Sequence, residues 1–149
     1  MIQKPYNVLL VEDDESHAEL VIRNLKRHQI VNKIFLVNDG EEALKFLFEQ
    51  KKTIAQANHP LPDVILLDLR LPRIDGLEVL KRIKEEPELA CIPVIILSTS
   101  QAQGDVKLAY QYGANSYLVK PIDYTDFNKL LTDFGYYWFK WNQKVIKEK

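Results

Sequence analysis

Short runs of apolar residues recur along the chain, and between them lie longer segments with apolar residues three and four positions apart. An almost unbroken apolar run is typical of a strand buried on both faces of a parallel sheet, whereas the wider spacing is typical of an amphipathic helix. Five strands are predicted: Asn7–Val11, Lys33–Val37, 64–69, Pro93–Leu97 and Ser116–Val119. A helix is predicted after each of them, starting near Glu15, Glu41, Leu77, Ala102 and Asp123.

The alternation of five strands and five helices predicts an α/β domain, a (βα)5 unit with one parallel sheet covered on both faces. The flavodoxin-like strand order 2-1-3-4-5 is the expectation for this class, although the local pattern does not itself encode strand order. In that order the first and third strands are neighbours. Ligands then bind at the carboxyl edge of the sheet, where these two strands end.

Local signals refine the ends of the predicted elements. Gly113 is expected in a left-handed conformation at the end of the fourth helix, and Asp123 is expected to cap the start of the last helix. The second helix is expected to end near Phe48. The polar segment Gln50–Pro62 is expected to form an exposed loop that is long for this class of fold.

The composition fits one globular domain, because 46% of the 149 residues are hydrophobic and 28% are charged. The net charge of −1 does not indicate binding to nucleic acid or to an anionic membrane. The single cysteine, Cys91, cannot form a disulfide within the chain and suits a reducing compartment. No apolar stretch approaches the roughly 18 residues that a membrane-spanning helix needs, so a cytoplasmic protein is expected.

One acid, Asp68, interrupts the third apolar run, in the segment VILLDLRLPRIDG at 64–76. An unpaired buried charge is strongly disfavoured, so Asp68 is expected where the strand opens into a loop. The turn signals LP and DG later in this segment indicate that the loop follows directly. Asp68 is therefore predicted at the carboxyl edge of the sheet.

Polar residues also follow the other predicted strands. Glu12 and Asp13 end the first strand, Ser98 ends the fourth, and Lys120 ends the fifth. If the first and third strands are neighbours, the carboxylates of Glu12, Asp13 and Asp68 converge and raise one another's pKa. A hard divalent cation relieves that repulsion, and oxygen ligands suit Mg²⁺. The alternative is that these residues are helix-terminal acids, a helix cap and a surface lysine.

Together these groups are suited to accepting a phosphoryl group. Asp68 would be the nucleophile, and Lys120 and Mg²⁺ would neutralise phosphoryl oxygens. The Ser98 hydroxyl would donate a hydrogen bond to one of those oxygens. We therefore interpret Asp68, Ser98 and Lys120 as the reactive group, and Glu12, Asp13 and Asp68 as metal ligands.

The same residues resemble the receiver domain of two-component response regulators. The resemblance rests on the Glu12-Asp13 pair, Asp68, Ser98 and Lys120-Pro121 at the spacings of that family, and it covers about Tyr6–Leu131. It implies a receiver fold in which Asp68 accepts phosphate from the phosphohistidine of a sensor histidine kinase. It also implies a phosphoacceptor signalling protein and not an enzyme.

Further roles are implied by this resemblance alone. Tyr117 occupies the position of the aromatic switch residue, which shifts together with Ser98 on phosphorylation. The backbone carbonyl of Arg70 is implied as a further metal ligand. The Lys120–Pro121 peptide bond is implied to be cis.

A narrower resemblance is carried by three segments, ELACIPVIILSTS, YGANSYLVKPIDYTDF and GYYW, and by the long loop after the second helix. These segments look like those of the small response regulators paired with cyanobacterial phytochromes. The implied kinase partner is therefore a phytochrome.

Arg70, two positions after Asp68, has no role that the resemblance fixes for its side chain. The side chain is expected to point toward the mouth of the site, where it would screen the phosphoryl group from water and slow its hydrolysis. It could equally lie on the surface or contact the kinase.

The last predicted helix carries a stripe of large apolar residues at helical spacing: Phe127, Leu130, Leu131, Phe134, Trp138 and Trp141. The first part of this stripe is expected to pack on the sheet, whereas Tyr136, Tyr137 and Phe139 lie off the stripe. Large exposed apolar patches mark interfaces, and aromatic residues are enriched in them. A homodimer is therefore predicted, through Phe134, Tyr137, Trp138 and Trp141.

Residues 132–149 follow the receiver-like core as a helical extension with a basic, solvated end. This extension is too short for a DNA-binding output domain, so residues 1–149 are expected to form a single receiver domain. Such a protein would signal through protein–protein contacts and not through nucleic acid.

Two other functions fit parts of the pattern. A Mg²⁺-dependent phosphohydrolase would also use an aspartyl nucleophile, but it usually needs a second acid two positions later, where this chain has Arg70. A pure interaction domain would keep the fold without the chemistry, and the complete set of acids, hydroxyl and lysine argues against it.

Overall fold

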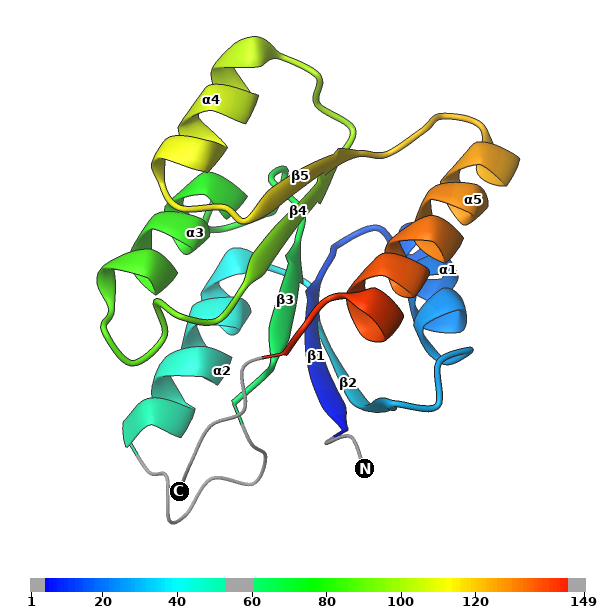
Figure 1. The fold of residues 1–149 in the computed structure, drawn as a ribbon. Coiled ribbons are helices and arrows are strands. Elements are labelled where there is room, and N and C mark those ends of the chain that lie inside the picture. Colours follow the sequence, from blue (N-terminus) through cyan, green and yellow to red (C-terminus); the bar gives the residue numbers. More distant parts are fainter. Residues whose placement is uncertain (1–4, 53–60, 145–149) are drawn as a thin grey trace.

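The computed structural model describes residues 5–52 and 61–144, which form a parallel five-stranded sheet with helices on both faces (Figure 1). The strand order β2-β1-β3-β4-β5 confirms the predicted flavodoxin-like order. The strands are β1 (Tyr6–Val11), β2 (Val31–Val37), β3 (Val64–Leu67), β4 (Val94–Ser98) and β5 (Ser116–Val119). The helices are α1 (Glu15–Leu25), α2 (Gly40–Lys52), α3 (Gly76–Glu85), α4 (Gln103–Gln111), α5 (Tyr124–Gly135) and a π-helix, η1 (Tyr136–Trp141).

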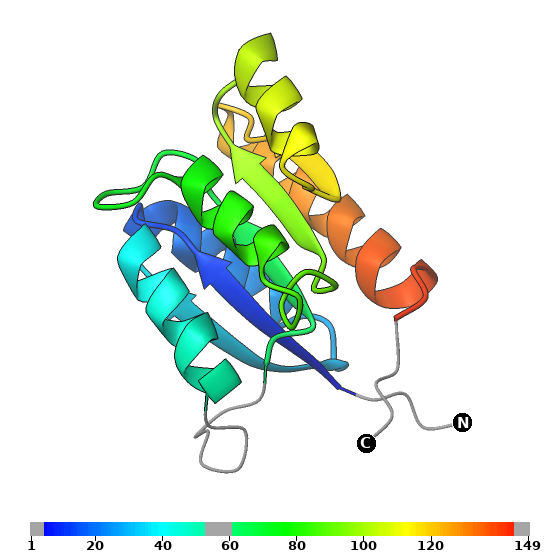
Figure 2. The same cartoon turned by 90° about the vertical axis from the view of Figure 1, so that its left-hand side faces the viewer.

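The sheet separates two apolar layers, because successive side chains of a strand point to opposite faces. Leu9 and Ile65 pack with α2, α3 and α4, whereas Leu10 and Leu66 pack with α1 and α5. Figure 2 is viewed from the side of α2, α3 and α4, and it shows these helices in front of the sheet. None of the described helices is both long and apolar enough to span a membrane.

The register of the central strands aligns their carboxyl ends. Val11 of β1 pairs with Leu67 of β3, so the residues that follow these strands are neighbours. At the other side of β3, β4 and β5 end together, and the N–H of Lys120 donates to the carbonyl of Ser98 at 2.8 Å. The ends of four strands therefore meet along one edge of the sheet.

Three local predictions can be compared with the backbone. Gly113 has a φ of +102°, and the Asp123 side chain accepts a hydrogen bond from the N–H of Asp126 at 3.0 Å, which confirms both helix-end signals. The expectation that the Lys120–Pro121 bond is cis is wrong, since none of the peptide bonds in the described ranges is cis. The trans form is the lower-energy state for most bonds that precede proline.

Helix α2 is longer than predicted, because it continues past Phe48 to Lys52. Residues 49–52 (EQKK) are all good helix formers, and none of them is a helix breaker. The loop predicted at Gln50–Pro62 therefore begins later than expected. Residues 53–60 of that loop lie outside the described residues.

The end of the chain departs from a regular α-helix at Gly135, where α5 passes into η1. A π-helix has i→i+5 hydrogen bonds and therefore wider turns, which change the residue that faces inward. Phe139 is buried as a result, and its ring packs edge-on against Tyr6 of β1, with centroids 5.1 Å apart. The prediction that Phe139 lies off the buried stripe is wrong, because it assumed α-helical turns throughout.

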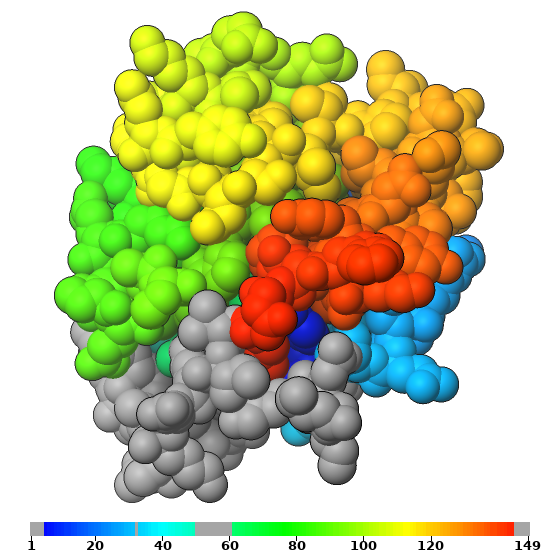
Figure 3. Space-filling view, viewed as in Figure 1, coloured from blue at the N-terminus to red at the C-terminus, as the bar shows by residue number. Residues whose placement is uncertain are grey.

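Gly135 allows this close packing because it has no side chain. A Cβ at this position would lie 2.2 Å from Nε2 of His28, which follows α1. The His28 ring also contacts Phe139 and Tyr136, with centroids 5.3 and 6.1 Å away. Figure 3 shows η1, in red, on the surface beside α5.

Lys144 is the last residue that the structure describes, and it contacts residues at the start of the chain. Its Nζ donates to the carbonyl of Pro5 at 2.9 Å, lies 3.2 Å from Oδ1 of Asp63, and sits over the Tyr6 ring. Oδ2 of Asp63 in turn accepts from the N–H of Asn7 at 2.7 Å. These contacts fasten the C-terminal extension to the start of β1.

Candidate functional site

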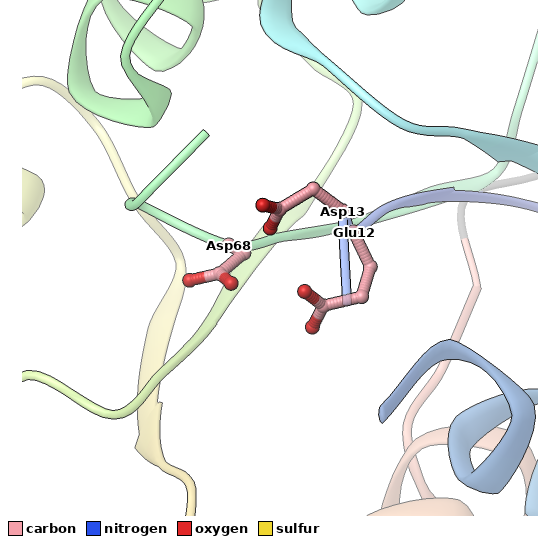
Figure 4. A group of neighbouring side chains, drawn as sticks. All are labelled: Glu12, Asp13 and Asp68. Atoms are coloured by element: carbon pink, nitrogen blue, oxygen red, sulfur yellow. The ribbon is translucent and has the colours of Figure 1, made fainter. Parts of the chain in front are cut away.

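Three carboxylates meet at the carboxyl edge of the sheet, as predicted. Glu12 and Asp13 follow β1, and Asp68 follows β3, so each is carried by one of two paired strands. Each offers a carboxylate oxygen within 4.8 Å of the other two, and Figure 4 shows the three groups gathered in one place. Glu12 and Asp68 are buried, whereas Asp13 is exposed, so the cluster reaches solvent on one side.

Lys120 supplies the positive charge of this cluster. Its Nζ donates to Oε1 of Glu12 and to Oδ2 of Asp68, which lies 3.2 Å away. The ammonium therefore bridges the acids that follow β1 and β3. Only 2% of the Lys120 side chain is exposed, so the alternative that it is a surface lysine is wrong.

The electrostatics of the cluster favour a cation. The pKa of Glu12 is raised to about 7, chiefly because the carboxyl group is buried; the Lys120 ammonium opposes this rise and the Asp68 charge adds to it. The single charge of Lys120 does not balance three carboxylates, and a bound cation would favour the charged form of Glu12. All of the candidate ligand atoms are oxygens, which suits a hard divalent cation that keeps some of its water.

His17 belongs to this site, although its sequence position gave no clear signal. It lies in the first turn of α1, and its Nδ1 is 3.1 Å from Nζ of Lys120. Asp14 caps the helix and accepts hydrogen bonds from the N–H groups of Ser16 and His17. The only available hint was that α1 starts directly after the acids, so its first turn must lie at the same edge.

Ser98 and Tyr117 both contact one residue of the segment after β4. The Oγ of Ser98, which is fully buried, accepts from the N–H of Ser100 at 3.2 Å. The hydroxyl of Tyr117 donates to the carbonyl of Ser100 at 2.8 Å. The predicted hydroxyl and aromatic switch residues are therefore connected through the backbone of Ser100.

Arg70 turns its side chain toward α4. Its N–H donates to Oδ1 of Asp68 at 3.4 Å, but its guanidinium pairs with Asp105, with Nη2 and Oδ2 2.7 Å apart. The same Oδ2 of Asp105 accepts from the Ser100 hydroxyl at 2.5 Å. Sequence reasoning missed this ion pair, because its two residues are 35 positions apart.

The predicted interface residues lie near the surface of the C-terminal extension. Tyr137 is 58% exposed and Trp141 is 75% exposed. Phe134 and Trp138 are half-buried, and their rings stack with centroids 6.1 Å apart. Two of the four predicted residues are therefore exposed, and the other two are half-buried.

Comparison with known proteins identifies several relatives. Residues 8–132 match the family model for the response regulator receiver domain. The response regulator Rcp1 of Synechocystis sp. is 38% identical over 136 residues, which cover 91% of this chain and 90% of that protein. The probable methanogenesis regulatory protein FilR2 of Methanothrix harundinacea is 38% identical over 141 residues, which cover 95% and 88%.

Solved structures give the same picture. The Mn²⁺-bound form of Rcp1 has a TM-score of 0.87 at 37% identity, and the match covers 95% of this chain and 100% of that one. The phosphorylated cyanobacterial phytochrome response regulator RcpA has a TM-score of 0.86 at 33% identity, with 94% and 98% covered.

Proposed function

The chain belongs to the response regulator receiver domain family, and from this premise we propose that Asp68 accepts a phosphoryl group from a sensor histidine kinase. The observation that carries the proposal is the setting of Asp68. Its carboxylate is buried beside Glu12, lies within the acidic cluster, and is hydrogen-bonded to the ammonium of Lys120. A carboxylate nucleophile with a nearby cationic donor is what phosphoryl transfer requires.

The acidic cluster fits a divalent cation, and we propose Mg²⁺. Glu12, Asp13, Asp68 and the backbone carbonyl of Arg70 would hold it. When bound, this ion supplies charge neutralisation at the phosphoryl oxygens. The Mn²⁺-bound structure of the relative Rcp1 supports a divalent ion of this kind.

The other site residues act on the transferred group directly. An oxygen of Asp68 bonds to phosphorus as the donor's bond to phosphorus breaks, and the leaving group departs on the opposite side. Lys120 donates a hydrogen bond to a phosphoryl oxygen, and the Ser98 hydroxyl donates another. No second acid stands two positions after Asp68, so we expect at most slow hydrolysis of the aspartyl phosphate and no enzymatic turnover.

We propose that Ser98 and Tyr117 transmit the phosphorylation state. When the Ser98 hydroxyl turns to the phosphoryl group, its bond to the N–H of Ser100 is lost. The Tyr117 hydroxyl, which is bonded to the carbonyl of the same residue, then moves with it. The surface of α4 and β5 would change, and protein–protein contacts would read that change.

A phytochrome is our proposed kinase partner. Several structural neighbours are phytochrome or bacteriophytochrome response regulators, including RcpA. FilR2, a probable methanogenesis regulatory protein, is as similar to this chain in sequence as Rcp1 is. The cytoplasmic location expected from the sequence stays a prediction.

The proposed function is tested by intact mass spectrometry after incubation with Mg²⁺ and acetyl phosphate. We expect one phosphoryl adduct in the wild type and none in Asp68→Asn. Asp75→Asn is the matched control, since Asp75 is an exposed acid of the same loop whose side chain makes no cap hydrogen bond. Unlimited consumption of the donor would indicate a phosphohydrolase, and the absence of an adduct would indicate a pure interaction domain.

We also propose a homodimer formed through Phe134, Tyr137, Trp138 and Trp141. Analytical ultracentrifugation at micromolar concentration should detect dimers of the wild type and mainly monomers of a Tyr137→Ser/Trp141→Ser variant. Tyr110→Ser, which changes a similarly exposed aromatic residue of α4, should remain dimeric. A wild type that is entirely monomeric, with and without the phosphodonor, would contradict the dimer.

A further inference from the structure

The ammonium of Lys120 has three N–H groups, and the structure provides three acceptors for them. Two acceptors are the acids Glu12 and Asp68, and the third is Nδ1 of His17, 3.1 Å from Nζ. Lys120 is buried, so an N–H without an acceptor would not be compensated by water. His17 is thus the one uncharged acceptor of this ammonium among the described residues.

The contact determines the protonation of the imidazole ring. An ammonium group can only donate, so Nδ1 must be the unprotonated nitrogen and the proton must lie on Nε2. Nε2 points toward the exposed side, where Oδ2 of Asp14 is 3.9 Å away. The neutral ring therefore offers Lys120 a lone pair, and its other nitrogen faces a carboxylate.

His17 is also held in place by contacts of its backbone and of its ring. Its backbone N–H is bonded to Oδ1 of Asp14, the cap of α1, at 3.1 Å. Its ring and that of Phe127 of α5 form a T-shaped pair, with centroids 5.4 Å apart and planes at 77°. His17 is consequently a fixed acceptor between α1 and α5, whereas a water molecule at this position would be free to turn.

We propose that His17 is a positioning residue for phosphoryl acceptance, and this inference rests on the proposed role of Asp68. The bond to His17 occupies one N–H of Lys120 and directs the other two toward Glu12 and Asp68. During transfer, the N–H that faces Asp68 moves to a phosphoryl oxygen, while the bond to His17 keeps Nζ in place. Without this acceptor the ammonium turns, and a phosphoryl oxygen loses its cationic donor.

Acetyl phosphate is the probe for the test, with the full chain and saturating Mg²⁺. The bond that forms joins an Asp68 oxygen to phosphorus, and the bond that breaks joins phosphorus to the acetyl oxygen, which leaves with its electron pair as acetate. The rate constant for adduct formation is followed by intact mass at several donor concentrations. This separates the maximal rate from the concentration that gives half of it.

Two variants of nearly equal shape isolate the acceptor. His17→Asn keeps an acceptor atom close to the place of Nδ1, and His17→Leu removes it. We expect the maximal rate of His17→Leu to fall about tenfold, in line with the loss of one hydrogen bond to a charged group. We expect His17→Asn to stay within about threefold of the wild type, since it keeps that bond.

A purely structural role of the ring predicts the opposite pattern. If His17 serves only to pack on Phe127, then Asn and Leu should be equally slow, and Phe127→Leu should be slow as well. Our proposal expects Phe127→Leu to slow the reaction less than His17→Leu does, because the acceptor atom of His17 remains. Loss of folded protein would lower the fraction that can be labelled but not the rate constant, so the two effects are read separately.

Three outcomes decide the question. A slow Leu variant together with a fast Asn variant supports the positioning role. Equal rates for these two variants overturn it and leave the function of Asp68 intact. A wild type that forms no adduct overturns both proposals.

Discussion

Arg70 and Asp105 form an ion pair with Nη2 and Oδ2 2.7 Å apart, and this pair joins the segment after β3 to α4. The Asp105 side chain is 17% exposed and also accepts a hydrogen bond from the Ser100 hydroxyl. Arg70, two positions after Asp68, is thus held by Asp105. Asp105 in turn binds Ser100, whose backbone contacts Ser98 and Tyr117.

Releasing Arg70 should change the lifetime of the phosphoryl group. If the guanidinium screens that group from water once it is free, Asp105→Ala should lengthen the lifetime and Arg70→Ala should shorten it. We expect changes of about two- to fivefold, because an exposed ion pair is worth little. Decay of the mass adduct after removal of the donor measures them, and Arg73→Ala is the control. An unchanged decay in Arg70→Ala would disprove screening.

Removing one acid of the cluster should weaken binding of Mg²⁺. Asp13→Asn takes away a charged ligand. Substitution of residues that only contact the ligands already lowers metal affinity by about 10–100-fold. Isothermal titration calorimetry should therefore show at least that loss. Asp14→Asn should bind like the wild type, since Asp14 is a helix cap and Asn caps equally well. Equal affinities for the Asp13 variant and the wild type would exclude Asp13 as a ligand.

The contact between Gly135 and His28 predicts a strongly non-additive pair of substitutions. Gly135→Ala places a methyl group against the imidazole and should lower the free energy of unfolding by about 1–3 kcal/mol. In a His28→Ala background the same change should be neutral or stabilising, because alanine favours a helix over glycine. Gly104→Ala in α4, where the added methyl group meets open space, should cost nothing. Urea unfolding of the wild type, the two single variants and the double variant measures the coupling, and additive effects would contradict the packing described.

His28 should also make the C-terminal extension sensitive to acid. Burial lowers the pKa of His28, and the nearby charge of Arg27 adds to that shift. The folded protein then binds fewer protons than the unfolded chain. The contribution of His28 to stability is therefore complete above the unfolded pKa of about 6.5 and is lost as the pH falls through the folded pKa. Glu12, whose pKa is raised, acts in the opposite direction. The Tm of the wild type should therefore fall relative to that of His28→Gln between about pH 7.5 and pH 5.5. Parallel Tm curves would contradict this.

Truncating Phe139 should be far more damaging than truncating its exposed neighbour. Phe139→Ala removes the ring that packs on Tyr6 and should cost about 3–4 kcal/mol of unfolding free energy. Tyr137→Ala should stay within about 0.5 kcal/mol at concentrations where the protein is monomeric, because surface changes are usually that small. Equal losses for the two variants would mean that the extension does not pack on β1 in solution.

The sheet and the acidic cluster could be predicted because the sequence encodes them locally. Each buried strand is a run of apolar residues, and each polar site residue interrupts or ends such a run. Once the class of fold sets the strand order, Glu12, Asp68 and Lys120 have to meet at one edge. Their convergence therefore follows from position along the strands, with no knowledge of tertiary contacts.

Other features of the site depend on contacts that no local pattern encodes. The pairing of Arg70 with Asp105 and the bond between His17 and Lys120 join residues that are far apart in the chain. The burial of Phe139 depends on a change of helix type at Gly135, which shifts every later side chain around the axis. A search for regular spacing assumes a constant period and therefore assigns Phe139 to the wrong face.

The ties between Lys144, Asp63 and the start of β1 have a consequence for where this protein can be divided. The family model ends at residue 132, before η1 and Lys144. A fragment cut there would expose Tyr6 and leave Asp63 without its lysine, although every residue of the acidic cluster would be retained. The family model thus ends before the packing does, and η1 and Lys144 pack as one unit with the first strand of the chain.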